Sequence, residues 1–426
     1  MSDLVIRGGR VIDPAQGRDE NVDVLIRDGR VAEIGQGLAA PEVIDASRLW
    51  VVPGLIDLHV HLREPGGEAK ETIATGARAA AAGGFACVVA MPNTSPAIDK
   101  GYLVRYTMMQ ARASRGAEVL VAGALTEGRA GEKPSNAAGL ARAGAVALTD
   151  DGDEVADARV MLVCMQEAAR VGLPVLVHAE DPALVGGGVM NAGALATKLG
   201  LPGRSALSEE IAVARDIRLA REAGCRLHVQ HVSARGSLAL VAEAKARGEK
   251  VTCEATPHHL ALTEEACATY DSTYKVNPPL RTEQDRDALA HALVDGTVDV
   301  IATDHAPHTA EEKKKPFDAS PSGMIGLETA LGVVMTYFVR ADVLSPARMV
   351  ELMSLNPARI LGSKDMGTLA PRSVGHVTLI DPAKTWTVEP GKFESKARNT
   401  PFAGREFTGR AVATIVSGRV VWRPED

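Results

Sequence analysis

The 426-residue sequence has few aromatic residues, few cysteines and no long apolar run. Phe, Trp and Tyr make up 3% of the chain, so the core must be built mainly from aliphatic side chains. No apolar run approaches the roughly 20 residues that cross a bilayer, which argues against a membrane protein. The five cysteines are scattered and form no CxxC pair, so we interpret them as small core residues and reduced thiols of a cytoplasmic protein.

The sequence also lacks an excess of positive charge. Its formal net charge of −7 argues against a nucleic-acid partner and against an anionic membrane surface. The first residues, MSDLVIRGGRVID, contain no basic start followed by an apolar stretch, so they predict no secretory signal. With 46% hydrophobic residues, the chain has enough apolar material for a large core.

Short β-rich runs separated by turn signals occupy both ends of the sequence. LVIRGGRVID and VDVLIRDGRVAEIG lie near the start, and the Asp28-Gly29 pair between apolar runs is a hairpin signal. The same pattern of short β-rich runs occurs near the other end in VGHVTLID and ATIVSGRVVW, with a turn at Ser417-Gly418. We therefore predict one small β-sandwich-like domain built from residues 1–52 and 363–426.

The middle of the chain, residues 53–362, repeats a strand followed by a helix. The apolar runs that suit buried parallel strands are VVPGLIDLHVHL, FACVVAMP, EVLVAGALT, AVALTDD, PVLVHAE, RLHVQHV, VTCEAT and VDVIATDH. Ala-rich segments with helical periodicity lie between most of them, and two of these, ETIATGARAAAAGG and SEEIAVARDIRLAREAG, close on Gly. Eight strands alternating with helices predict an α/β fold, a (β/α)₈ TIM-type barrel.

Histidine and aspartate residues lie at the ends of five of these strands. The first strand closes on His59 and His61, and alternate residues of a strand point to the same face. Because active sites of such barrels form at the carboxyl ends of the strands, we expect the strand-end residues to converge. The predicted metal ligands are His59, His61, Asp151, His178, His231 and Asp304.

Imidazole and carboxylate ligands suit Zn²⁺, with Mn²⁺ or Co²⁺ as substitutes. Six ligands exceed what one catalytic zinc takes, so two metals that share a bridging carboxylate account for the set better. Asp150 is a rival of its neighbour Asp151, and His228 has the wrong strand parity relative to His231. The remaining histidines are interpreted as structural or surface residues: His258, His259, His291, His305 and His376.

The motifs PGLIDLHVHLREPG, MPNT, TDDG, VHAED, HVS, KVNPPLR and IATDHAPH together resemble the amidohydrolase superfamily, and more closely the bacterial class I dihydroorotases. The resemblance covers nearly the whole chain. It implies two zinc ions bridged by Asp151, with His59, His61 and Asp304 on one ion and His178 and His231 on the other. It also implies reversible cyclisation of N-carbamoyl-L-aspartate to L-dihydroorotate in pyrimidine biosynthesis, for which we expect Asp304 to be the catalytic proton carrier.

The residues themselves favour a small anionic substrate that carries an amide. Arg63 follows His61 by two positions and can present its planar guanidinium to a carboxylate, which Asn93 and His308 can join. Asn277 offers both a donor and an acceptor to a ring amide. The resemblance assigns these residues to substrate binding and adds main-chain groups further on. The predicted substrate-binding set is His61, Arg63, Asn93, Asn277, His308, Ser322 and Gly323.

Two other interpretations remain open. Allantoinases and dihydropyrimidinases share the fold and the HxH start, but those relatives bridge their metals with a carboxylated lysine on the fourth strand. No lysine lies between Lys133 and Lys198, so Asp151 must serve here. Asn277 within VNPPLR favours a dihydroorotase over an allantoinase, whereas Arg63 does not discriminate. A non-catalytic scaffold for aspartate transcarbamoylase is the third interpretation, and the complete ligand set argues against it.

The resemblance also suggests partners. Members of the family are often homodimers, and some need aspartate transcarbamoylase for activity. We therefore consider both a homodimer and a complex with that enzyme. The charged loop EEKKKPFDASPSG, residues 311–323, is the least ordered-looking part of the barrel region. We expect the segment of residues 309–323, which directly follows His308, to act as a mobile lid.

Overall fold

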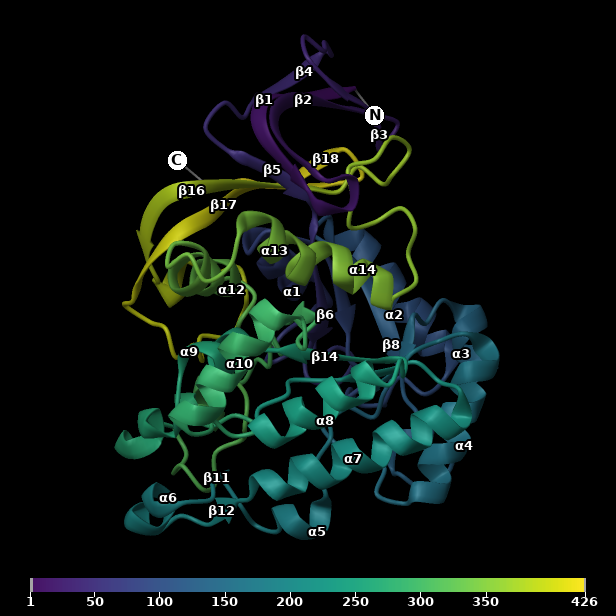
Figure 1. The fold of residues 1–426 in the computed structure, drawn as a ribbon, viewed down its shortest axis with the longest axis vertical. Coiled ribbons are helices and arrows are strands. Elements are labelled where there is room, and N and C mark those ends of the chain that lie inside the picture. Colours follow the sequence, from purple (N-terminus) through teal and green to yellow (C-terminus); the bar gives the residue numbers. More distant parts are fainter. Residues whose placement is uncertain (1–2, 425–426) are drawn as a thin grey trace.

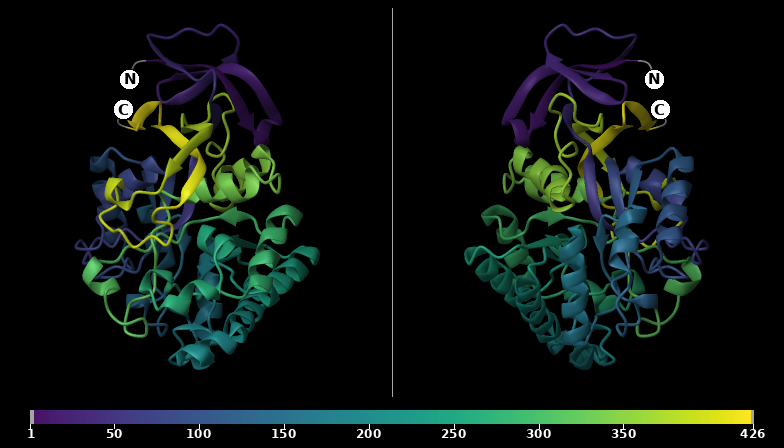
Figure 2. Two further views of the ribbon diagram at one scale, coloured as in Figure 1. Left: turned by 90° about the vertical axis from the view of Figure 1, so that its left-hand side faces the viewer. Right: turned by 90° about the vertical axis from the view of Figure 1, so that its right-hand side faces the viewer.

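The computed structural model describes residues 3–424 (Figure 1). Two large hydrogen-bonded sheets organise the chain, one in the middle of the sequence and one shared by its two ends. Figure 2 shows the sheet of the two ends above the body that contains the central sheet. Within these residues no helix is both long and apolar enough to cross a bilayer.

The central sheet is the predicted barrel. Neighbouring strands are parallel and follow the order of the chain, and the Val60–His305 bridge links the two edges of the sheet. The His61 amide donates to the carbonyl oxygen of His305 at 2.9 Å, so the first strand meets the eighth. The strands are β6 (Leu55–Val60), β7 (Phe85–Ala90), β8 (Glu118–Gly123), β9 (Ala147–Leu148), β10 (Val175–Val177), β13 (Leu227–Val229), β14 (Val251–Ala255) and β15 (Val300–Ile301). The predicted (β/α)₈ fold is confirmed.

Helices surround the barrel strands (Figures 1 and 2). Thr72 forms a capping box at the start of α1, and Gly224 ends α7 in the left-handed conformation that favours glycine. Both Ala-rich segments singled out in the sequence are therefore helices. The longer barrel helices are α1 (Ile73–Ala82), α2 (Gly101–Ser114), α3 (Ala137–Ala143), α4 (Ala158–Val171), α7 (Ala206–Ala223), α8 (Arg235–Ala246) and α10 (Glu283–Asp295). Shorter ones are α12 (Ala330–Val334), α13 (Pro346–Val350) and α14 (Asn356–Ile360).

The second sheet joins the two ends of the chain, as predicted. Strand β16 from the C-terminal part pairs antiparallel with β5 from the N-terminal part, which makes the sheet continuous. Its strands are, in order, β18 (Arg419–Trp422), β17 (Glu406–Val416), β16 (Val377–Thr387), β5 (Trp50–Pro53), β1 (Leu4–Asp13), β2 (Arg18–Arg27) and β3 (Arg30–Gly35), and β4 (Glu42–Asp45) pairs with β1. The boundary proposed at residues 52/53 falls inside β5, and the domain limits stay a prediction.

Short elements between the barrel strands line the approach to their carboxyl ends. Between β10 and β13 the chain forms a small parallel pair of strands, β11 (Met190–Asn191) and β12 (Gly203–Arg204). The other short elements are α5 (Pro182–Val185), α6 (Ala194–Leu199), α9 (Pro257–Ala261) and α11 (Ala310–Lys313). All five cysteines are buried and none forms a disulfide, in agreement with their interpretation as core thiols.

Candidate metal centre

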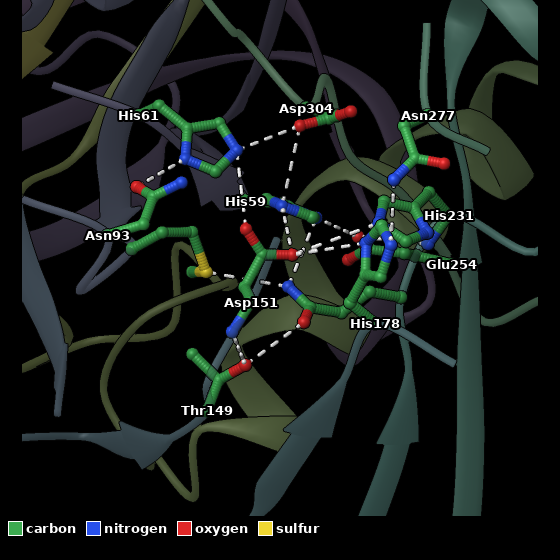
Figure 3. Close-up of polar contacts among 12 residues, drawn as sticks. His59, His61, Asn93, Thr149, Asp151, His178, His231, Glu254, Asn277 and Asp304 are labelled. Atoms are coloured by element: carbon green, nitrogen blue, oxygen red, sulfur yellow. Dashed lines mark hydrogen bonds and ion pairs between the residues drawn. The ribbon is translucent and has the colours of Figure 1, made fainter. Parts of the chain in front are cut away.

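The six predicted ligand residues converge at the carboxyl ends of the barrel strands (Figure 3). Asp151 lies at the centre of the cluster. Its Oδ1 is 3.2 Å from His59 Nε2, 3.9 Å from His178 Nδ1 and 3.8 Å from His231 Nε2, and its Oδ2 is 3.4 Å from His61 Nε2. The cluster thus contains two groups of potential metal ligands that share the Asp151 carboxylate: His59 with His61, and His178 with His231.

Asp304 lies beside the first group. Its Oδ1 lies 3.0 Å from His61 Nε2 and 3.5 Å from His59 Nε2. Burial by itself would raise the pKa of Asp304, but the neighbouring imidazoles of His59 and His61 lower it below its usual range. The carboxylate is therefore ionised at neutral pH and can accept a proton.

The residues fit divalent metal ions. Among the described residues, His59 Nε2 and Asp151 Oδ1 are buried without a hydrogen-bond partner, although buried polar atoms are normally paired. Burial would lower the pKa of His59, yet the carboxylates of Asp151, Asp304 and Glu254 raise it well above its usual value. The buried carboxylates therefore favour a proton on His59, and a dication could take the place of that proton and balance their charge.

Residues outside the predicted set hold the ligands in place. Glu254, fully buried on β14, accepts from His59 Nδ1 at 2.7 Å and contacts His228 Nε2 at 3.0 Å. Gln230 Nε2 lies 3.1 Å from His59 Nδ1. A carboxylate on the second nitrogen of a ligating histidine fixes its orientation and increases its basicity. Glu254 was recognisable only as a lone charge inside an apolar strand, VTCEAT.

A similar contact supports His178. Glu180 Oε2 lies 3.2 Å from His178 Nε2 and accepts from Arg204 at 2.8 Å. Burial would raise the pKa of Glu180, but His178 and Arg204 lower it to about 2. The sequence offered a weak signal for Glu180, since it follows His178 by two residues, and none for Arg204.

Asp150 has a different environment from Asp151. Its carboxylate accepts from the Thr126 amide at 3.1 Å and from the Thr126 hydroxyl, so it is engaged with the loop after β8. Three histidines outside the predicted ligand set contact neighbouring side chains. His228 contacts Thr252 and Glu254, His305 contacts Glu71 and His376 contacts Glu118.

The predicted substrate residues line one cavity of about 210 Å³ beside the metal cluster. Arg63 donates from Nε to the carbonyl oxygen of Pro307 at 3.2 Å, and Asn93 Oδ1 accepts from His61 Nδ1 at 2.8 Å. The cavity is lined by His61, Arg63, Asn93, Asp151, Gly152, His178, His231, Asn277, Asp304, Ala306, His308, Ser322 and Gly323. Its volume suits a small molecule, while the binding roles of these residues stay predictions.

The cavity wall around Gly323 is tightly packed. A Cβ atom at Gly323 would lie 2.9 Å from the Ala306 Cβ and 3.0 Å from His308 Nε2, so this position needs glycine. His308 Nε2 donates to the carbonyl oxygen of Ser322 at 2.9 Å. Burial and the charge of Arg63 lower the pKa of His308 to about 3.

Three cavity residues have an unusual backbone conformation. Arg63, His231 and Asp304 have positive φ angles of 61°, 32° and 47°. Non-glycine residues rarely adopt this region, and such strain concentrates at functional sites, where surrounding structure enforces it. The chain thus turns sharply where these strands end, which directs the three side chains into the cavity.

Solved structures place this architecture in a known class. The L-hydantoinase (dihydropyrimidinase) of Arthrobacter aurescens aligns over 100% of this chain and 97% of its own, with a TM-score of 0.89 and 27% identity. A D-hydantoinase from a Bacillus species gives a TM-score of 0.83 at 27% identity, over 99% and 95% of the two chains. Fold and site define the chain as an amidohydrolase, a metal-site enzyme that acts on cyclic amides.

Sequence comparisons identify the family within that class. A family model described as dihydro-orotase-like matches residues 48–237. The dihydroorotase of Citrifermentans bemidjiense is 51% identical over 423 residues, which is 99% of each chain. That of Pelotomaculum thermopropionicum is 52% identical over 421 residues, 98% of each chain. This chain belongs to the dihydroorotase family.

Proposed function

We propose that this enzyme interconverts N-carbamoyl-L-aspartate and L-dihydroorotate in cytoplasmic pyrimidine biosynthesis, with two zinc ions bridged by Asp151. The observation that carries the proposal is the full-length similarity to dihydroorotases together with a cavity that joins Arg63 and Asn277 to the His/Asp cluster. Zn²⁺ fits the imidazole and carboxylate donors. Bound zinc would polarise the amide carbonyl and make a water molecule more acidic.

The cavity residues bind the substrate and transfer the proton. Arg63, Asn93 and His308 bind the substrate carboxylate, and the guanidinium supplies the compensating charge. Asn277 binds the ring edge, and main-chain groups of Ser322 and Gly323 close the other side. Asp304 accepts the proton of the attacking water and delivers it to the ring nitrogen that leaves. In the reverse direction, the same carboxylate takes the proton from the ureido nitrogen as this nitrogen attacks the side-chain carboxyl group, and passes it to the carboxyl oxygen that leaves. With the one proton that ring closure consumes from solvent, that oxygen leaves as water.

A hydantoinase-type activity is the second candidate, because hydantoinase structures align over nearly the whole chain. The discriminating test is a substrate panel of dihydroorotate, hydantoin, allantoin and dihydrouracil, assayed with one zinc-loaded preparation. We expect kcat/KM for the hydrolysis of dihydroorotate to exceed kcat/KM for each of the three neutral rings by at least about a hundredfold. The reason is that only dihydroorotate offers Arg63 a carboxylate. Faster hydrolysis of a neutral ring would reject the proposal.

The metal part of the proposal has its own test. Asp151 supplies a carboxylate directly, whereas a lysine bridge would first have to react with carbon dioxide. Apo-protein titrated with zinc in carbon-dioxide-free buffer should therefore bind two equivalents, measured by calorimetry, and regain full activity. A strict bicarbonate requirement, or saturation at one equivalent, would contradict the bridged pair.

The partners remain part of the proposal. A homodimer and a complex with aspartate transcarbamoylase are both proposed from the family resemblance, with no contact surface assigned. Sedimentation of the purified protein, alone and mixed with the transcarbamoylase of the same organism, measures both states. Full activity of the isolated chain would remove the need for the second partner.

A further inference from the structure

Arg204 lies beside the substrate cavity and outside its lining. It ends the short strand β12, and its side chain is 14% exposed. Its Nη1 donates to Glu180 Oε2 at 2.8 Å and to Asn277 Oδ1, and its Nη2 donates to the carbonyl oxygen of Gly188 at 3.1 Å. One guanidinium thus joins a carboxylate that contacts His178 to the amide that we propose for substrate binding.

The chemistry of Arg204 decides how the Asn277 amide is oriented. Guanidinium groups only donate hydrogen bonds, so the atom of Asn277 that faces Arg204 must be the acceptor Oδ1. The amide nitrogen then points to the opposite side, where Nδ2 lies 3.1 Å from His178 Nε2. Figure 3 shows this nitrogen directed toward the cluster and the oxygen directed away from it. Asn277 therefore presents N–H groups to the cavity.

We infer that Arg204 is a positioning residue that fixes the Asn277 amide as a hydrogen-bond donor toward the substrate. The inference rests on the proposed substrate role of Asn277. It follows that the Asn277 side chain donates a hydrogen bond to a carbonyl or carboxylate oxygen of the substrate. It does not accept a hydrogen bond from a ring N–H. From the sequence we expected Asn277 to offer the substrate both a donor and an acceptor. With Oδ1 bound to Arg204, only the donor faces the substrate.

Arg204 could instead affect the metal site, because it contacts Glu180, which contacts His178. The two sets of contacts predict different effects of removing Arg204, one on substrate binding and the other on zinc affinity. If Arg204 acts through Asn277, its removal weakens substrate binding and leaves the metal content unchanged. If it acts through Glu180, its removal loosens His178 and lowers zinc affinity, because contacts to the second nitrogen of a ligand tune the metal site.

A double-mutant cycle distinguishes these two effects. The variants are Arg204→Met, Asn277→Ala and the double variant, with Arg204→Lys as the conservative change. The control is Arg348→Met on α13. Arg348 is also part-buried and also binds a glutamate and main-chain carbonyl oxygens, two of them where Arg204 binds one. Each variant is assayed for KM and kcat with dihydroorotate, for zinc content and for melting temperature.

We expect Arg204→Met and Asn277→Ala each to raise KM by about tenfold, the effect of losing one oriented polar contact. Residues that act through one interaction are not additive, so the double variant should match Asn277→Ala alone. Arg204→Lys should recover part of the loss, since lysine can still donate to Oδ1. Zinc content should stay at the wild-type value, and Arg348→Met should leave KM unchanged.

Several results would overturn the inference. One is an unchanged KM in Arg204→Met. Another is a fold-increase of KM in the double variant that equals the product of the fold-increases in the two single variants. Zinc loss in Arg204→Met would assign the residue to the His178 side instead. If Arg204→Met does not fold, Arg204→Lys carries the same cycle. An unchanged KM in Asn277→Ala would instead reject the proposed substrate role of Asn277, and the inference would fall with it.

Discussion

At the scale of single residues, the chemistry of the site follows from buried charge. Asp151, Asp304 and Glu254 are carboxylates with almost no exposure, and their immediate neighbours are imidazoles. Burial penalises an ionised carboxylate, but nearby His59 keeps the pKa of Asp151 far below its usual value and lowers the pKa of Glu254 to about 2. The cluster therefore holds its negative charge at neutral pH, as a metal site requires.

The first residue-scale prediction concerns Arg63. Arg63→Met should raise KM for dihydroorotate strongly and leave zinc occupancy unchanged, because Arg63 lines the cavity and contacts no metal ligand through a hydrogen bond. Losing a charge-assisted pair in a partly dry pocket costs about 2–5 kcal/mol. Steady-state kinetics with zinc analysis measure both effects, and Arg78→Met, which removes an exposed surface ion pair, is the control. An unchanged KM would remove Arg63 from the substrate site.

The second residue-scale prediction separates two adjacent aspartates. Asp151→Asn should lose most of the bound metal, because a neutral amide cannot balance two zinc charges. Asp150→Asn should keep the metal and lower the melting temperature instead, since Asp150 binds the amide and hydroxyl of Thr126. Zinc analysis and thermal unfolding of the two variants measure this. Greater metal loss in Asp150→Asn would mean that the roles are reversed.

At the scale of elements, the segment of residues 309–323 is tied down at several points. Lys275 Nζ donates to the carbonyl oxygens of Asp318 and Ser320, at 2.8 and 2.7 Å. Lys313 Nζ, within α11, donates to the carbonyl oxygens of Pro321 and Gly323, both at 3.0 Å. The mobility expected from the sequence stays a prediction, and the structure shows which contacts such a lid would have to break.

The element-scale prediction concerns Lys313. Burial lowers the pKa of Lys313 from 10.5 to about 8, so the docked segment binds fewer protons than a released one between these two pH values. By linkage, docking should become more favourable as pH rises through this interval, by up to about tenfold per pH unit. Tryptic cleavage after the exposed Lys314, normalised to a free peptide, should therefore slow between pH 8 and pH 9.5.

Two comparisons make this test specific. Lys313→Met has no group to titrate at this position, so its cleavage rate should lose most of the pH dependence, and Lys275, whose pKa burial also lowers, accounts for the rest. Saturating ligand should also slow cleavage, if the segment closes over the occupied cavity. Equal pH dependence in the variant and the wild-type protein would show that Lys313 does not control docking.

At the scale of the whole molecule, the barrel gathers residues that are far apart in the chain. His59 on β6 meets Glu254 on β14, and Asp304 after β15 meets His61 after β6. The terminal sheet adds none of the residues that line the cavity. It pairs β5 with β16 and so holds both ends of the chain beside the barrel.

The whole-molecule prediction concerns the reaction itself. Ring closure of the carbamoyl-aspartate dianion to the dihydroorotate monoanion consumes one proton near neutrality. Each unit rise in pH should therefore favour the open form about tenfold, or roughly 1.4 kcal/mol. The equilibrium ratio, approached from both sides with enzyme present and measured by chromatography, tests this. A ratio that is flat between pH 6 and pH 8 would mean that the reaction is misassigned.

The sequence alone determined the features that depend on short-range patterns. The period of apolar runs and helices predicted the barrel, because a buried parallel strand must be apolar on both faces. The strand ends then predicted that His59, Asp151 and Asp304 would meet, since parallel strands bring their carboxyl ends to one edge. Motif spacing and the lack of a lysine on the fourth strand pointed to the dihydroorotases among related enzymes.

Only the tertiary structure decided the contacts between residues distant in the chain. Nothing local places Glu254 against His59, 195 positions away, or Arg204 against Asn277, 73 positions away. Parity excluded His228 as a ligand but gave no hint that it would contact Glu254. Such contacts depend on how strands of different length end around the barrel and how loops return over it. Local sequence periodicity does not encode these distances, because they arise from the packing of the whole chain.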